Sequence, residues 1–402
     1  MNTFELVGKI VPCKETDNFK PYETKKFPSG DWGLKSLKFN AVCGTNRHLV
    51  EISDLVNVNN PDSMKIFTFS KGGQDDDGNK VKGEKMEVSF KDRNKPEIIA
   101  KVAEWKKWVI DTEIPGRRQA LAKAIEKFKD GTITDEQMEQ LGIHSVEEAE
   151  SELAVSEKRR CEYITAYDFI DKVNKLVNNP KAKDMIFRIV GTIDLDYSES
   201  KDMWYRHMNV QRIYRAADDA EIISKGHYEV VFGNEAVDDA DFEETKKIHI
   251  HGFVQQYINK YKKNFFAPMD FTLDGTKSEG KAKVWAKKFT FPDEYEGEYR
   301  VIGLDCDLLN GSQKVELTED MLTEEQRENL EYGLVTMDDI IKELGGDVYG
   351  DRVVDIVIDK LGRGYSKGSM ETAYTEDDMC KPHNELNDDD ELDIFADDDD
   401  DI

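Results

Sequence analysis

The first ninety residues alternate between apolar and polar positions, a pattern typical of β-strands with one buried face. Such runs cover residues 4–11, 34–42, 48–52, 64–69 and 85–90, and polar, turn-rich stretches separate them. Between residues 97 and 180 the period changes, because apolar side chains there recur every three or four positions. The sequence therefore predicts a β domain that is interrupted by a helical insertion.

Strand patterns return after the insertion. Residues 186–197 and 204–214 flank a polar turn and predict a long β-hairpin. Runs at 248–273, 283–291, 299–304 and 314–317 predict a second β group, 337–344 a short helix and 353–359 the last strand. Residues 187–214 and 249–274 share a strand–turn–strand pattern, which we interpret as a structural echo. The predicted fold class is mainly β with inserted helices (α+β).

The charge of the chain is concentrated at its carboxyl end. Of the net charge of -28, half lies in residues 371–402, where 15 acidic residues face a single lysine. A segment with so few apolar residues cannot bury enough surface to offset its ordering entropy, so we expect a disordered acidic tail. Its apolar and terminal acidic residues suit capture by a basic, hydrophobic pocket on a partner; they are Ile394, Phe395, Asp399, Asp400, Asp401 and Ile402.

Composition limits the other possibilities. A chain of 402 residues can form two domains besides the tail, and its 38% hydrophobic content allows substantial cores. No stretch approaches the roughly 20 apolar residues of a transmembrane helix, and the start lacks the layout of a secretory signal. The five cysteines are odd in number and form no CxxC pair. We therefore expect a cytoplasmic protein with reduced thiols.

Three stretches, residues 25–39, 201–215 and 257–288, combine cations with aromatic rings. Cations can follow the phosphates of a single strand while rings stack on its bases, each stack contributing about 1–3 kcal/mol. Burial in a core remains the alternative for any single aromatic on a strand. Alternation puts Trp204 and Tyr205 on opposite faces, so one of them should be core. The candidate DNA contacts are Trp32, Lys35, Lys38, Trp204, Tyr205, Arg206, Arg212, Tyr214, Tyr257, Tyr261, Lys262, Lys263, Phe265, Trp285 and Lys287.

Catalytic sites are weakly indicated. Asp194 with Asp196, and Asp305 with Asp307, place two carboxylates on one strand face, which suits magnesium, but no further ligands accompany them. Residues 249 and 251 form a similar histidine pair without zinc-ligand neighbours. The chain has no Walker loop, dinucleotide-binding glycine motif or serine elbow. We expect no enzyme activity, no cofactor and no bound metal.

Taken together, the opening β segment 4–10, the basic and aromatic hairpins 186–214 and 248–273, and the acidic carboxyl end resemble the single-stranded DNA-binding proteins built on OB folds, especially the larger ones of bacteriophages. In that family the acidic end commonly finishes in a phenylalanine, whereas here Phe395 is internal and Ile402 is last. The resemblance implies two OB-fold barrels, one at 1–217 with the insertion at about 97–180 and one at 218–370, followed by the tail.

The function implied is sequence-independent binding and protection of single-stranded DNA in replication or recombination. The tail would recruit replication or recombination proteins, and no membrane is involved. Two alternatives stay open. A phage scaffold or a DNA mimic would use the acidity of the chain to bind protein without affinity for DNA, and a DNA-processing enzyme would depend on Asp194 or Asp305. The sequence does not indicate the oligomeric state.

Overall fold

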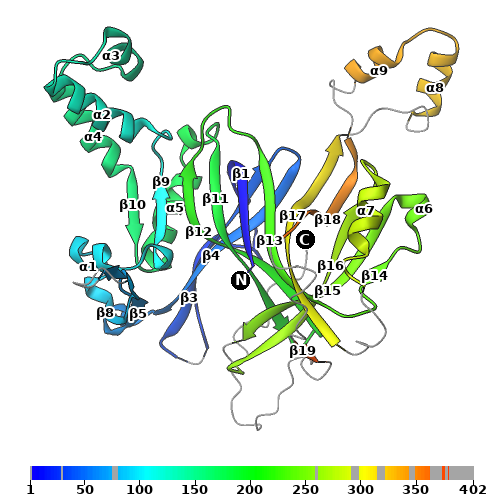
Figure 1. Cartoon of the computed structure of the whole chain (residues 1–402), viewed down its shortest axis with the longest axis horizontal. Helices are drawn as coiled ribbons and strands as arrows, with labels where there is room; N and C mark the ends of the chain where they lie inside the picture. The colour runs from blue at the N-terminus through cyan, green and yellow to red at the C-terminus, as the bar shows by residue number, and fades with distance from the viewer. Residues whose placement is uncertain are drawn as a thin grey trace.

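The computed structural model describes residues 2–28, 30–74, 80–258, 261–290, 298–314, 322–343, 349–362, 374–375 and 379. This part of the chain is mainly β with helices at its margins, which confirms the predicted mainly β class (Figure 1). Within the described ranges, no helix combines the length and apolar character needed to cross a membrane. The acidic tail, including the six partner-binding candidates 394, 395 and 399–402, lies outside the described residues.

Five strands of the N-terminal half close into a ring. They are β1 (Thr3–Pro12), β3 (Trp32–Cys43), β4 (Asn46–Asn57), β11 (Phe187–Ser198) and β12 (Met203–Arg215). Each strand pairs with the next in the order β1-β3-β4-β12-β11, and β11 returns to β1. The β4–β12 pair is parallel, and the other four pairs are antiparallel. We call this closed set of strands the first ring.

A second ring repeats this order. Its strands are β13 (Ile223–Phe232), β15 (Lys247–Ile258), β16 (Lys263–Asp274), β17 (Glu298–Lys314) and β18 (Tyr349–Leu361). They pair in the order β13-β15-β16-β18-β17 and back to β13, and again the third and fifth strands are the parallel pair. A helix precedes the fourth strand in both rings: α5 (Ala166–Val177) and α7 (Glu279–Ala286). The two hairpins with similar sequence patterns are therefore not equivalent in the fold, since β11–β12 are strands four and five of the first ring and β15–β16 are strands two and three of the second.

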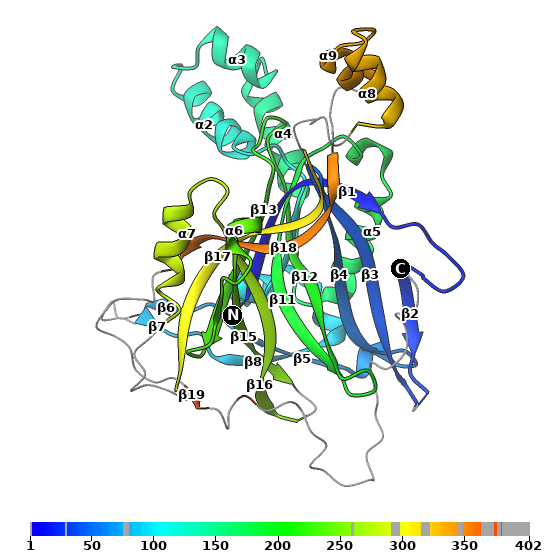
Figure 2. The same cartoon turned by 90° about the vertical axis from the view of Figure 1, so that its right-hand side faces the viewer.

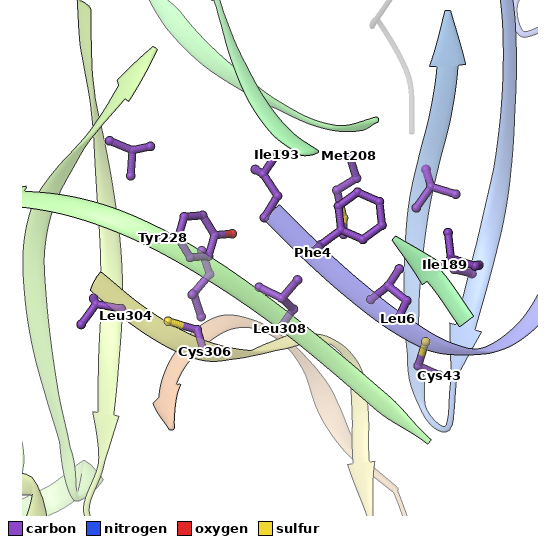
Figure 3. Close-up of a cluster of buried hydrophobic side chains, with 14 of the residues drawn as sticks. Phe4, Leu6, Cys43, Ile189, Ile193, Met208, Tyr228, Leu304, Cys306 and Leu308 are labelled. Atoms are coloured by element: carbon purple, nitrogen blue, oxygen red, sulfur yellow. The ribbon is translucent and has the colours of Figure 1, made fainter. Parts of the chain in front are cut away.

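The two rings share one continuous sheet and core. The first strands of the rings, β1 and β13, pair antiparallel, and a single cluster of buried side chains runs through both rings. Figure 3 shows Phe4, Leu6 and Met208 on one side of this cluster and Tyr228, Leu304 and Cys306 on the other. The rings are thus packed directly against each other, and residues 216–222 connect β12 to β13.

The alternating pattern of the sequence explains the ring walls. Along β3, Leu37, Phe39, Ala41 and Cys43 are buried while the residues between them face outward. Helix α5 follows the helical period, with Phe169 and other apolar residues buried on one stripe against β3 and β4. Burial of this apolar stripe holds α5 against the first ring.

The residues between β4 and α5 form an insertion with cores of its own (Figure 1). A two-stranded ribbon, β5 and β8, packs with α1 and stays outside both rings, although the sequence placed these runs in the opening β domain. Helices α2, α3 and α4 form an arm around Leu121. The insertion comprises η1 (Pro61–Ser63), β5 (Lys65–Phe69), β6 (Gly73–Gln74), β7 (Lys80–Val81), β8 (Lys85–Ser89), η2 (Phe90–Asp92), α1 (Pro96–Lys101), η3 (Glu104–Lys106), β9 (Trp108–Asp111), α2 (Arg117–Lys129), α3 (Asp135–Leu141), α4 (Val146–Lys158) and β10 (Arg160–Tyr163).

The remaining elements are short. They are β2 (Tyr22–Lys26), η4 (Pro180–Ala182), β14 (Val237–Asp238), α6 (Phe242–Thr245), α8 (Glu324–Glu331), α9 (Met337–Glu343) and β19 (Tyr374–Thr375). One sequence prediction is wrong here: residues 283–291 were expected as a strand, but residues 283–286 belong to α7. Ala282, Ala286 and Phe289 are buried at three- and four-residue spacing, so the period was helical and the alternation of lysines with apolar residues was coincidental.

Candidate nucleic-acid interface

The ends of two long hairpins, β11–β12 and β15–β16, meet in space (Figure 2). The Tyr261 hydroxyl, beside the second hairpin's turn, donates a hydrogen bond to a carboxylate oxygen of Glu199 in the first. Nearby, the backbone N–H of Leu195 donates to the side-chain oxygen of Gln256 at 3.2 Å. Hairpins from different rings therefore present one joint surface. We call it the tip surface and define it by Tyr197, Lys201, Met203, Trp204, Tyr257, Tyr261, Lys262 and Lys263.

The tip surface exposes apolar and aromatic groups to solvent. Tyr257 is 50% exposed and Met203 is 54% exposed. Across the first turn, the rings of Tyr197 and Trp204 lie 5.2 Å apart between centroids. Tyr261 packs edge-on against Phe265 at 5.3 Å. Tyr257 is thus the exposed ring of the tip surface, and Tyr197, Trp204 and Tyr261 are half-buried rings around it. An exposed ring can stack against a flat ligand.

Phe265 has a supporting position. It is buried, at 5% exposure, so it belongs to the core beneath Tyr261 and does not face a ligand. Trp204 is partly buried against the core, and its ring nitrogen makes no hydrogen bond to any described residue. Phe265 is thus a core residue, which is the alternative to DNA contact that the sequence left open for any aromatic residue on a strand.

The charges at the tips favour an anion. Lys262 and Lys263 are exposed. The neighbouring carboxylates of Glu199 and Asp202 accept hydrogen bonds from tyrosine hydroxyls. The hydrogen bond to Asp202 raises the pKa of Tyr197 to about 12. These bonds leave both carboxylates charged, but the three exposed lysines of the tip surface, Lys201, Lys262 and Lys263, outnumber them.

The tip turns are also strained. Three non-glycine residues in the described part of the chain have positive φ, and two of them, Asp202 and Lys262, lie in these turns at φ 51°. A left-handed residue with a side chain costs free energy, and such strain tends to gather at binding sites. Asp202 accepts the hydrogen bond of Tyr197 from this left-handed conformation.

The outward face of the first ring has a different character. There His207 Nδ1 lies 2.8 Å from Glu51, and Lys38 lies 4.0 Å from the same carboxylate. Burial opposes the charge on His207, but the hydrogen bond with Glu51 and the negative charges of Glu51 and Asp196 together outweigh it and raise the pKa of the imidazole. Asp196 lies 3.6 Å from the other ring nitrogen. Lys38 and Tyr205 therefore border a mixed, partly acidic face and do not line a basic groove.

The other β3 candidates lie away from the tip surface. Lys35 is 4% exposed, and its ammonium group contacts Asp171 at 2.7 Å and the Tyr167 carbonyl at 3.0 Å. The prediction that Lys35 contacts DNA conflicts with this burial. Trp32 is 48% exposed, but it pairs with the last residue of β4, whereas Trp204 lies near the beginning of that strand. About eleven residues of strand, roughly 35 Å, separate the two tryptophans.

The remaining candidates are dispersed. Arg206 is exposed near the first tip, whereas Arg212 donates to the Glu104 carbonyl at 2.8 Å and so fastens the insertion to β12. Tyr214 lines a cleft of about 450 Å³ between the helical arm and the first ring. Trp285 is half-buried on α7 beneath Lys281, whose nitrogen lies 4.1 Å from its ring centre, and Lys287 caps the end of that helix.

The candidate metal pairs have other partners. Asp194 accepts hydrogen bonds from Asn209 at 2.6 Å and from Thr192 at 3.0 Å, and Asp305 lies 2.8 Å from His227 Nδ1. Nowhere in the described ranges do three or more histidine, cysteine, aspartate or glutamate side chains gather as a metal site would require. The acidic pairs serve as strand-to-strand contacts.

Sequence reasoning missed Tyr197 and Met203. The hairpin register places Tyr197 opposite Trp204 and Ser198 opposite Met203, so both flank the turn. Counting back from that turn would have found them, because cross-strand partners follow from the hairpin register.

Comparisons with known proteins add little. No protein-family model matches the chain, and no curated protein matches it either. Among solved structures, the chain is similar to a deletion mutant of the single-stranded DNA binding protein from Thermus aquaticus. The identity is 7%, the TM-score is 0.29, and the likeness covers 77% of this chain and 87% of the other. A TM-score this low carries no argument, so the function must be argued from the site itself.

Proposed function

We propose that this protein binds single-stranded DNA without sequence preference and that the tip surface is its principal contact. The proposal rests on the contact between one hairpin end from each ring. The tip surface combines the hairpin of strands two and three of the second ring with the turn between strands four and five of the first. OB folds bind oligonucleotides on the face of strands two and three and on the loops that join strands one to two and four to five.

The strand order supports an OB-fold assignment for both rings. Each ring has five strands, a parallel third–fifth pair and a helix before the fourth strand. On this assignment the first OB domain spans 1–217 with its insertion, the second spans 218–370, and 371–402 is the acidic tail. The role that we propose for the tail is recruitment of replication or recombination proteins.

The groups on the tip surface favour binding over chemistry. Tyr257 and Trp204 offer rings that can stack on any base, and Lys262 and Lys263 can follow phosphates. Neither kind of contact distinguishes one base from another, which supports sequence independence. The chain has a net charge of -28, which favours the competing hypothesis of a scaffold or DNA mimic without affinity for DNA. The experiment must distinguish this hypothesis from DNA binding.

The test uses fluorescence anisotropy of a labelled oligo-dT of about 30 nucleotides, long enough for two OB units. Tyr257→Ala should weaken binding about 5- to 150-fold, the range expected for loss of one stacked base. Replacing Lys262 and Lys263 together by alanine should reduce the salt slope by about 1.4, since each phosphate contact on a single strand contributes about 0.7.

Matched controls lie elsewhere. Tyr332 is 74% exposed beside α8, which Figures 1 and 2 both place at the end of the molecule away from β15 and β16. Tyr332→Ala, and alanine at the exposed Lys172 and Lys175 of α5, should leave affinity and salt slope unchanged. Absence of binding by the unaltered chain would favour the scaffold or mimic. Wild-type affinity in the tip variants would refute the tip surface.

A further inference from the structure

The ribbon of β5 and β8 has one buried and one exposed face. Its Ile66, Met86 and Val88 pack with α1 in a small core. Alternation then turns Phe67 and Phe69 to the opposite face, beside Lys85, which pairs with Phe69 across the ribbon. This second face is open to solvent. Together with Trp105 and Lys106 of η3, the residues Phe67, Phe69 and Lys85 form what we call the aromatic platform.

The rings of the platform are unusually accessible. Phe67 is 76% exposed and Trp105 is 57% exposed. Phe69 and Trp105 lie 5.3 Å apart with planes at 37°. Two such rings beside a third form an apolar patch of a kind that marks binding sites on soluble proteins.

The platform is held in place from both sides. The Ala103 N–H donates to the Phe69 carbonyl at 2.8 Å. Gln211 of β12 donates to the Trp105 carbonyl at 2.9 Å, and Arg212 donates to the preceding carbonyl. The backbone of Trp105 is therefore anchored to β12 of the first ring, while its indole side chain remains exposed. A fixed ring loses little entropy when it stacks on a ligand.

The positive charge beside the aromatic platform favours an anionic ligand. The Lys106 nitrogen lies 4.8 Å from the Trp105 ring centre and 5.8 Å from that of Phe69. Lys85 and Lys106 form no ion pair with a described carboxylate, whereas Lys65 is neutralised by Glu87 at 2.6 Å. The platform is thus locally cationic on a strongly acidic chain. Flat rings beside free ammonium groups fit unstacked bases and their phosphates.

We propose that the aromatic platform is a second stacking site for the same single strand. The proposal rests on the function proposed above but uses none of the tip residues. From Trp204 to Gln211, β12 runs seven residues, about 23 Å, so one strand of some 30 nucleotides can reach both surfaces. Glu51 and Asp196 lie on the outward face of the first ring, and we therefore expect two separate contacts and no continuous groove.

The experiment titrates the full chain and its variants with the same labelled oligo-dT while also recording tryptophan fluorescence. Phe67→Ala and Trp105→Ala should each weaken binding about 5-fold or more, as loss of a stacked base does. Trp105→Phe keeps a ring and should retain most of the affinity while losing the Trp105 share of the quenching. Tyr332→Ala is the control, and unfolding curves verify that each variant is folded.

The outcomes separate the two proposals. Weaker binding by folded Phe67→Ala and Trp105→Ala, with reduced quenching in Trp105→Phe, supports the platform. Wild-type affinity in these variants, together with weakened Tyr257→Ala, overturns the platform and leaves the tip surface in place. If the unaltered chain binds no oligo-dT, both proposals fail. Unchanged quenching in Trp105→Phe also counts against the platform, because Trp105 would then not touch the strand.

Discussion

Acid should loosen the junction of the two rings, through His48. This side chain is 2% exposed, and its Nε2 lies 2.7 Å from the Ser224 hydroxyl. That hydroxyl donates to the Leu308 carbonyl at 2.7 Å, so Nε2 must donate to Ser224. The relay joins β4 of the first ring to β13 and β17 of the second.

The size of the effect follows from the pKa of His48. Burial lowers this pKa from 6.5 to about 4. Between these values the unfolded chain binds the proton and the folded chain does not, so stability is full above pH 6.5 and falls as the pH drops. Linkage gives a loss of about 2 kcal/mol at pH 5 and about 3 kcal/mol below pH 4.

The assay is urea unfolding at pH 7.5 and pH 5 for the unaltered chain and for His48→Gln. Glutamine can still donate to Ser224 but does not titrate. The variant should lose about 2 kcal/mol less than the unaltered chain between the two pH values, because all other titrating groups are common to both. Equal losses would refute the argument that a buried neutral His48 joins the rings.

Two further substitutions test packing. Gly191→Ala should destabilise by about 2–3 kcal/mol in urea unfolding, because a Cβ would lie 1.9 Å from the Asn209 carbonyl oxygen. Gly280→Ala, which meets nothing within 4 Å, is its control and should show no such loss. Lys107→Ala should cost about 1.5–3 kcal/mol, because the ammonium group of this 1% exposed lysine donates hydrogen bonds to two carboxylates. Lys71→Ala removes a half-exposed lysine from one of the same carboxylates and should cost less than about 1 kcal/mol. Similar costs for the members of either pair would contradict the packing described.

Local pattern was sufficient to predict much of the β structure. The strands of the first ring and the hairpin 187–215 could be found because burial alternates along them, as in β3. Ring closure could not be found this way. The parallel contact of β4 with β12 joins Glu51 to Asn209, and no local feature of either segment specifies a partner so distant in sequence.

The candidate site was only partly predictable. Tyr257 and Lys262 stood out as a basic, aromatic turn, and the structure places them at the tip of a hairpin. Lys35 could have been excluded, since alternation gives it the same inward phase as Leu37 and Phe39. The exposed face of β5 could not be recognised, because an apolar strand face is normally buried and only the three-dimensional arrangement shows that Phe67 is uncovered.

Photocrosslinking of oligo-dT to the full chain, followed by peptide mapping, shows whether single-stranded DNA contacts the tip surface. We expect crosslinks within β11–β12 and β15–β16, at or beside Trp204, Tyr257 and Tyr261, and their loss when salt is raised. Crosslinks that avoid both hairpins, or no crosslinks under conditions that label a known single-strand binder, would contradict it.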